Sequence, residues 1–119
     1  MKQGKEKLAV STPGRICLFG EHQDYLGLPV IAAAISLRIS IEGEQRTDLN
    51  VRIELPDIKS HVRFSLDKQL RYQRERDYFK SGVKVLLRNV FTFSRGFDCV
   101  VRGEIPIGAG TSSSSALTV

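Results

Sequence analysis

The chain has 119 residues, of which 41% are hydrophobic and 26% charged, and this composition is typical of one soluble globular domain. Its formal net charge of +5 is spread along the sequence, since even the most basic stretch, residues 68–80, also contains Glu75 and Asp77. This pattern favours a solvated surface of mixed charge over a patch that binds nucleic acid.

Targeting signals and cysteines indicate the cellular compartment of the protein. No run reaches the roughly 18 apolar residues of a membrane span, and residues 1–7 are polar with no signal-peptide core behind them. The two cysteines, Cys17 and Cys99, lie far apart within apolar stretches, which indicates two buried thiols rather than a disulfide framework or a zinc site. We therefore expect a cytoplasmic protein that binds neither membranes nor nucleic acid.

Strand patterns fill the first half of the chain. A short apolar run at residues 16–19 ends at a glycine. Apolar and polar residues then alternate over 35–42, and again over 51–55 and 62–66, with polar turns between the runs. A period of two is typical of half-buried strands, so we expect an antiparallel meander with one face in solvent.

The period then changes to that of a helix. Apolar residues recur at helical spacing from Phe79 to Phe91, which places Lys80, Lys84 and Arg88 on the predicted solvent face. Gly82 lies inside this helix and costs about 1 kcal/mol relative to alanine. We therefore expect another element to pack closely against Gly82.

The last part of the chain combines a strand with a glycine-rich run. We expect a strand over residues 97–105, then a Gly/Ser-rich run from Pro106 to Ser115, followed by about one helical turn's worth of sequence. A phosphate-binding loop is usually followed by a helix whose first amides bind the anion, and that helix should be incomplete here. The order of elements predicts an α+β domain, an antiparallel sheet packed with helices, without an interdomain linker.

The Gly/Ser-rich run is a candidate phosphate-binding loop. Gly108 and Gly110 allow positive φ and a close approach of the backbone to a ligand, and the exposed amides of such a turn form an anion-binding concavity. The serines at 112–115 offer hydroxyls to phosphate oxygens or to a magnesium ion. No lysine precedes the Ser/Thr residues, so this is not a Walker loop, and a flexible Gly/Ser tail is the plain alternative.

A second polar cluster follows the apolar run at residues 16–19. Glu21, His22 and Asp24 come within one turn, and carboxylates with a neutral imidazole suit the hydroxyls of a small polar ligand. The planar guanidinium of Arg15 can donate paired hydrogen bonds to a carboxylate or a phosphate. Taken singly, these residues also suit a surface ion pair, a hydrogen-bonded histidine and turn caps. Their spacing is not that of a His-x-x-x-His metal site.

Together these two segments resemble the galactokinase branch of the GHMP kinases. The galactokinase signature, Gly-Arg-x-Asn-x-x-Gly-Glu-His-x-Asp-Tyr, is similar to residues 14–25, with Cys17 in place of asparagine. The second family motif, Pro-x-Gly-x-Gly-Leu-Ser-Ser-Ser-Ala, is similar to residues 106–115, with Thr111 in place of leucine and Ser115 in place of alanine. Mevalonate kinases share Gly-Glu-His but generally lack the Asp-Tyr that follows here.

The resemblance implies a role for each of these residues. Glu21, His22 and Asp24 would bind the hydroxyls of the sugar, with Asp24 helping to select its configuration. Arg15 would be a catalytic residue beside the transferred phosphoryl group. The ATP phosphates would be wrapped by the loop residues Gly108, Ala109, Gly110, Thr111, Ser112, Ser113, Ser114 and Ser115. Ser114 would also be the ligand of Mg²⁺.

The implied function is that of a sugar kinase. The full-length parent would use ATP and Mg²⁺ to phosphorylate the anomeric hydroxyl of galactose or a related sugar. The implied fold is the GHMP kinase N-terminal domain, which is ribosomal protein S5 domain 2-like. We expect residues 1–119 to be part of that domain, with no counterpart of the C-terminal domain or of the family's catalytic aspartate. The alternatives are a non-catalytic module that binds sugar and ATP, and an inactive fragment with exposed apolar surface.

Overall fold

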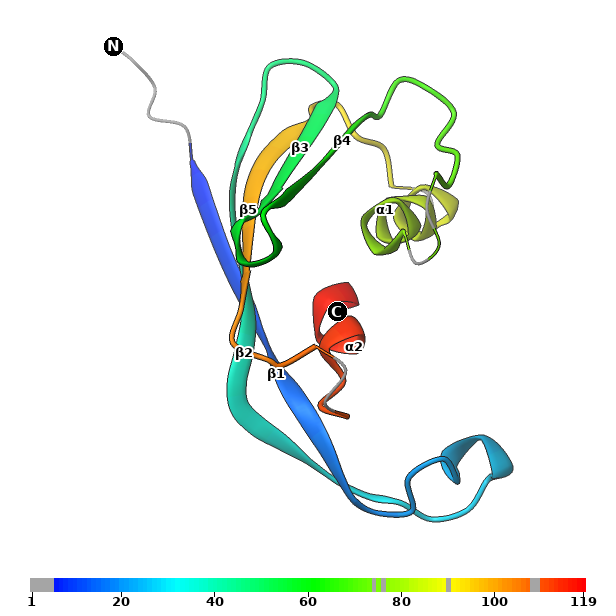
Figure 1. The fold of residues 1–119 in the computed structure, drawn as a ribbon. Helices are drawn as coiled ribbons and strands as arrows, with labels where there is room; N and C mark the ends of the chain where they lie inside the picture. The colour runs from blue at the N-terminus through cyan, green and yellow to red at the C-terminus, as the bar shows by residue number, and fades with distance from the viewer. Residues whose placement is uncertain (1–5, 74, 76, 90, 108–109) are drawn as a thin grey trace.

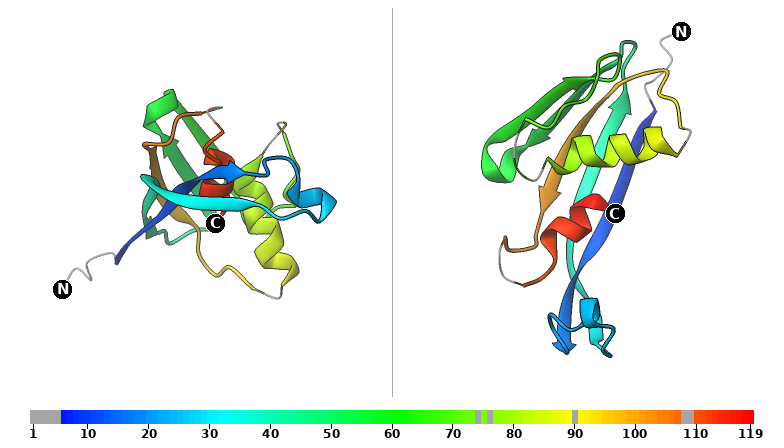
Figure 2. Two further views of the ribbon diagram at one scale, coloured as in Figure 1. Left: turned by 90° about the horizontal axis from the view of Figure 1, so that it is seen from below. Right: turned by 90° about the vertical axis from the view of Figure 1, so that its right-hand side faces the viewer.

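The computed structural model describes residues 6–119 except 74, 76, 90 and 108–109, and these residues form a five-stranded sheet with two α-helices (Figure 1). The strands are β1 (Lys7–Phe19), β2 (Ile31–Gln45), β3 (Asn50–Leu55), β4 (Ser60–Ser65) and β5 (Phe97–Gly103). The helices are α1 (Tyr78–Arg88) and α2 (Ser113–Thr118), with 3-10 turns η1 (Asp24–Leu26) and η2 (Pro56–Ile58). Both α-helices lie on the same face of the sheet (Figure 2). Neither of them has the length and apolarity needed to cross a bilayer.

The strands lie in the order β1-β2-β5-β3-β4. The β1–β2, β2–β5 and β3–β4 pairs are antiparallel, and the β3–β5 pair is parallel. The predicted α+β class is therefore confirmed, with one parallel pair in the sheet. The predicted meander is wrong, because β5 lies between β2 and β3. The chain connects β3 to β5 through β4 and α1, and parallel pairing requires a long connection of this kind.

The β1–β2 hairpin extends beyond the rest of the sheet and carries η1 at its tip (Figure 1). Its pairing is interrupted at Gly14, which faces residues 35–37 of β2, so that β2 bulges there. Leu37 in this bulge is 38% exposed, whereas Ile39 and Ile41 contribute to the core. The predicted alternation therefore fails at Leu37 and holds beyond it.

The hydrophobic core lies between the sheet and the helices. Val51 and Ile53 on β3 are its most deeply buried members, at 0% and 2% exposure. The other buried members of the cluster are Ile39, Cys99, Val101, Ile105 and Ala116. Ala116 belongs to α2, so the core holds the short helix that follows the Gly/Ser-rich loop. The remaining sequence is thus enough to form this helix over six residues.

In helix α1, Val83 is buried and Phe79 is partly buried against the core. Lys80, which the sequence placed in solvent, is only 4% exposed, so that prediction is wrong. The physical reason is that Lys80 precedes Val83 by three positions and shares its face of the helix. The exposed apolar residues of α1 are Val85, Leu86 and Leu87.

Gly82 on α1 is exposed, and a Cβ atom there would meet nothing within 4 Å, so the predicted close packing is wrong. We expect Gly82→Ala to raise the free energy of unfolding by about 0.5–1 kcal/mol, because alanine restricts the unfolded chain and favours the helix. Urea unfolding followed by circular dichroism measures this change. Gly43→Ala is the control expected to destabilise, since its Cβ would lie 2.8 Å from the carbonyl oxygen of Asp98. A lower midpoint for Gly82→Ala would contradict the structure of α1.

An ion-pair network holds the turn between β2 and β3. The guanidinium of Arg46 donates to both carboxylate oxygens of Asp48, at 2.7 and 2.8 Å, and to those of Asp98, at 2.9 and 2.8 Å. Hydrogen bonds from Arg46, and then from Asn50, hold the pKa of Asp48 well below its usual range. The network therefore ties the start of β5 to this turn.

The two thiols differ in exposure, and neither is in a disulfide. Burial raises the pKa of Cys99 to about 11. Cys17 is half-buried on β1, and its Sγ donates to the carbonyl oxygen of Phe19 at 3.3 Å. The prediction of two buried thiols is confirmed for Cys99 only.

Candidate functional site

The Gly/Ser-rich loop contacts β1 within the first sequence motif. The backbone N–H of Arg15 donates to the carbonyl oxygen of Thr111 at 3.1 Å. A Cβ atom on Gly14 would lie 3.0 Å from the same oxygen and 3.0 Å from the Cδ1 atoms of Ile35 and Ile105. Contacts of 3.0 Å are tighter than most that a Cβ atom makes, so any side chain at position 14 would push the loop and its neighbours away from β1.

The loop is a tight turn that leads into α2. Gly110 and Ser112 have φ values of 70° and 57°, in the left-handed region, and Ser112 precedes the first residue of α2. The hydroxyl of Thr111 donates to the carbonyl oxygen of Pro106 at 3.3 Å, which closes the turn. A turn of this kind before a helix is a suitable place for an anion. Two predicted phosphate-binding residues, Gly108 and Ala109, lie outside the described residues.

A groove of about 580 Å³ borders the loop. Loop residues 110–114 form one side of it. The other sides come from the β3–β4 turn, with Asp57 and Ile58, and from the start of α1, with residues 77–79. Buried apolar residues also line the groove: Ile39 and Val101 of the sheet, and Ile105 just after β5. Apolar walls with a few polar groups are typical of ligand-binding sites.

The other predicted residues lie at the tip of the β1–β2 hairpin. Glu21, His22 and Asp24 are all exposed, and His22 has a φ of 62° in the turn before η1. A Cβ atom built on Gly110 would lie 3.9 Å from Oε1 of Glu21. The structure thus brings Glu21 to the Gly/Ser-rich loop, and His22 and Asp24 share the same tip.

The remaining predicted residues occupy the surface near the loop. Arg15 is exposed on β1, and its backbone contacts Thr111. Ser114 and Ser115 are exposed on the first turn of α2. In the part of the chain that the structure describes, no group of three or more His, Cys, Asp or Glu side chains is placed to hold a metal ion.

Two acidic residues that line the groove were not identified from the sequence. The Oδ2 atom of Asp57 accepts a hydrogen bond from the N–H of Gly103 at 2.7 Å, which holds η2 against the end of β5. Asp77 precedes α1 and lines the groove. No sequence pattern predicted the position of Asp57. Asp77 had one signal, its spacing of three residues from Lys80.

Comparison with known proteins agrees with the arrangement of these motifs. The model described as the galactokinase galactose-binding signature matches residues 2–44, and the model of the GHMP kinases N terminal domain matches residues 77–119. The chain belongs to the GHMP kinase family. The signature at residues 2–44 places it in the galactokinase branch.

Relatives of known activity include galactokinases and mevalonate kinases. The GHMP kinase chain is 36% identical over 110 residues to the galactokinase of Roseiflexus sp., covering 92% of this chain and 28% of that protein. It is 32% identical over 123 residues to the mevalonate kinase of Pyrococcus furiosus, covering 95% and 36%.

Solved structures agree with these relationships. The crystal structure of Lactococcus lactis galactokinase complexed with galactose superposes with a TM-score of 0.82 and 31% identity, covering 96% of this chain and 30% of that one. The chain therefore spans about a third of the length of the relatives that it matches.

Proposed function

We propose that this GHMP kinase chain supplies the sugar-binding and phosphate-binding parts of an enzyme that phosphorylates the anomeric hydroxyl of galactose or a related sugar with ATP. Residues 1–119 would then be part of the N-terminal domain of that enzyme. The observation that carries the proposal is the contact between the two motifs. The backbone N–H of Arg15 donates a hydrogen bond to the carbonyl oxygen of Thr111, and Glu21 lies beside Gly110. Direct transfer requires the sugar and the phosphates to lie side by side in this way.

The hairpin tip would bind the sugar. The carboxylates of Glu21 and Asp24 can each accept hydrogen bonds from sugar hydroxyls, and the imidazole of His22 can donate or accept one. Arg15 lies on the same hairpin, next to the loop. Its guanidinium would stabilise the charge on the phosphoryl group during transfer, which depends chiefly on positioning and electrostatic stabilisation.

The groove beside the loop would bind the nucleotide, with its phosphates at Gly110–Ser115. The left-handed turn at Gly110 and Ser112, followed by the start of α2, fits an anion because backbone amides there are not used within the helix. Ser114, whose side chain is exposed, would be a ligand of Mg²⁺. A single hydroxyl suits this ion, because Mg²⁺ usually takes one or two protein oxygens and completes its shell with phosphates and water. An ATP-dependent enzyme of this kind would act in the cytoplasm.

A binding module without turnover is the second candidate. The exposure of Glu21, His22 and Asp24 favours it, because phosphoryl transfer to a sugar rather than to water requires a site that excludes water. Incubation of the chain with galactose, ATP and Mg²⁺, followed by ³¹P NMR, separates the two candidates. Formation of a sugar phosphate supports the kinase, and binding of both ligands without product supports the module.

Asp24→Ala is expected to weaken galactose binding by about tenfold or more, because it removes a charged hydrogen-bond acceptor from the hairpin tip. The affinity for a non-hydrolysable ATP analogue should stay within about twofold, since the groove is lined by other elements. Isothermal titration calorimetry with each ligand measures both effects. Gln23→Ala, at the neighbouring exposed position, is the matched control.

Each result of this titration has a definite meaning. Equal losses of galactose and nucleotide affinity would show that the role given to Asp24 is wrong. If the wild-type chain bound neither ligand, the proposed function itself would be contradicted.

A further inference from the structure

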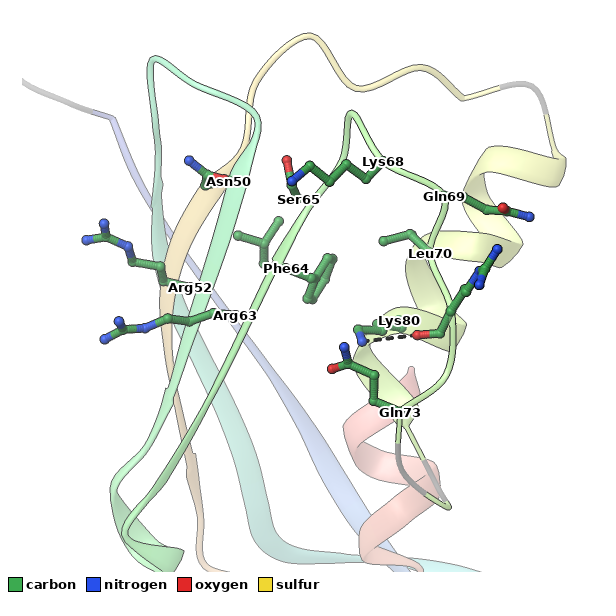
Figure 3. A pocket seen from close by; sticks show the side chains of 12 residues that line it. Asn50, Arg52, Arg63, Phe64, Ser65, Lys68, Gln69, Leu70, Gln73 and Lys80 are labelled. Carbon is green, nitrogen blue, oxygen red and sulfur yellow. Dashed lines mark hydrogen bonds between the residues drawn. The ribbon is translucent and has the colours of Figure 1, made fainter.

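Lys80 is the least exposed charged residue among those that the structure describes, at 4%. Its Nζ atom donates to the carbonyl oxygen of Arg71 at 3.1 Å and lies 3.6 Å from Oδ2 of Asp77. The ring centroid of Phe64 is 6.0 Å from the same atom. Figure 3 shows the ammonium group of Lys80 between α1 and β4, with its hydrogen bond to a backbone carbonyl oxygen as a dashed line. A buried ammonium group requires partners of this kind.

Lys80 and Asp77 line different cavities. Lys80 lines a cavity of about 610 Å³ between the β3–β4 hairpin and residues 68–73. Asp77 lines the groove that also contains the loop serines. Both side chains of the ion pair are nearly closed off from solvent, at 5% and 8% exposure. The Lys80–Asp77 ion pair therefore lies between the cavity and the groove, and its carboxylate lines the proposed nucleotide groove.

The other basic residues near this cavity do not converge on Lys80. Arg52 and Arg63 extend away from it on the other side of β3 and β4 (Figure 3). Lys84, one turn further along α1, lies over the ring of Tyr72 at 3.9 Å. Lys68 and Arg71 also line the cavity, and the feature that distinguishes Lys80 is its ion pair with Asp77.

We propose that Lys80 is a positioning residue that prepares the groove for a polyanionic nucleotide by neutralising the charge of Asp77. This inference rests on the proposed function. A carboxylate without its partner in the groove wall would repel a triphosphate, and its poor exposure means that water and salt screen this repulsion weakly. Lys80 would act on the nucleotide through Asp77, without contacting it.

Removing the charge of Lys80, alone and together with the charge of Asp77, tests this proposal. We expect Lys80→Met to weaken the binding of a non-hydrolysable ATP analogue by about tenfold, which corresponds to 1.4 kcal/mol, and to leave galactose affinity unchanged. The double variant Lys80→Met/Asp77→Asn should recover analogue affinity to within about threefold, because it removes the unpaired carboxylate. Lys84→Met makes the same chemical change one turn away and should have no effect. Titration calorimetry, with circular dichroism as the check on folding, measures all three.

The outcomes separate charge from packing. If Lys80→Met and the double variant lost affinity equally, packing would explain the effect and the proposal would be overturned. If Lys80→Met failed to fold, the double variant and Asp77→Asn carry the test, and both should bind the analogue about as tightly as wild type. A wild-type chain that bound no analogue would overturn the proposed function, whereas wild-type affinity in Lys80→Met would overturn the role of Lys80 alone.

Discussion

Replacing Ile53 with alanine is expected to lower the free energy of unfolding by about 3 kcal/mol. Ile53 is 2% exposed and lies on β3, opposite Val62 of β4 on one side and Cys99 of β5 on the other. Truncation would leave a cavity in the centre of the core, and the paired strands on both sides limit how far the structure can relax into it. Urea unfolding at equilibrium measures the loss.

Ile58→Ala is the matched control for this change. Ile58 is 56% exposed, so its truncation should change stability by less than about 0.5 kcal/mol. Similar losses at Ile53 and Ile58 would mean that the core is not where the structure places it.

Gly14→Val is expected to weaken binding of the ATP analogue by about tenfold or more and to lower stability by about 1–3 kcal/mol. The new side chain would overlap the carbonyl oxygen of Thr111, which belongs to the backbone of the Gly/Ser-rich loop. The Ile35 and Ile105 side chains can shift, but the loop must move away from β1 to make room. That movement breaks the hydrogen bond from Arg15 and separates the two motifs.

A graded series makes this experiment specific. Gly14→Ala requires shifts of only a few tenths of an ångström, so its effect on analogue binding should fall between those of wild type and Gly14→Val. Ala9→Val adds the same type of side chain at an exposed position of β1 and should leave binding unchanged. Full nucleotide affinity in Gly14→Val would show that the contact between the loop and β1 has no role in binding.

The sequence predicted the strands and α1 better than it predicted their arrangement. Alternation over 51–55 and 62–66 identified β3 and β4 because one face of β3 is buried and one face of β4 is partly buried. Local alternation does not contain information about which strands pair, and for that reason the position of β5 between β2 and β3 was missed. The burial of Lys80 was missed because a helical pattern treats every lysine as a surface residue, whereas Asp77 and Arg71 provide partners for this one.

The candidate site was predicted only as far as its motifs. Residues 14–25 and 106–115 were singled out because their glycines and polar side chains suit a bound ligand and because the two segments resemble family motifs. The contact of Thr111 with Arg15 depends on the tertiary fold, and no spacing in the sequence indicated it. The far side of the groove, with Asp57 and Asp77, comes from segments that the strand and helix patterns described only as element ends.

The position of β5 also decides the order in which the domain can be assembled. The β1–β2 and β3–β4 hairpins are each formed by neighbouring segments, and β5 is the strand that joins them. During synthesis both hairpins leave the ribosome before residues 97–103, so they cannot become one sheet until β5 has emerged. Contacts between such distant segments form late, because the intervening chain must first be closed into a loop. The Gly/Ser-rich loop follows β5 directly, so the proposed phosphate-binding loop can take its place only after β5 has joined the two hairpins.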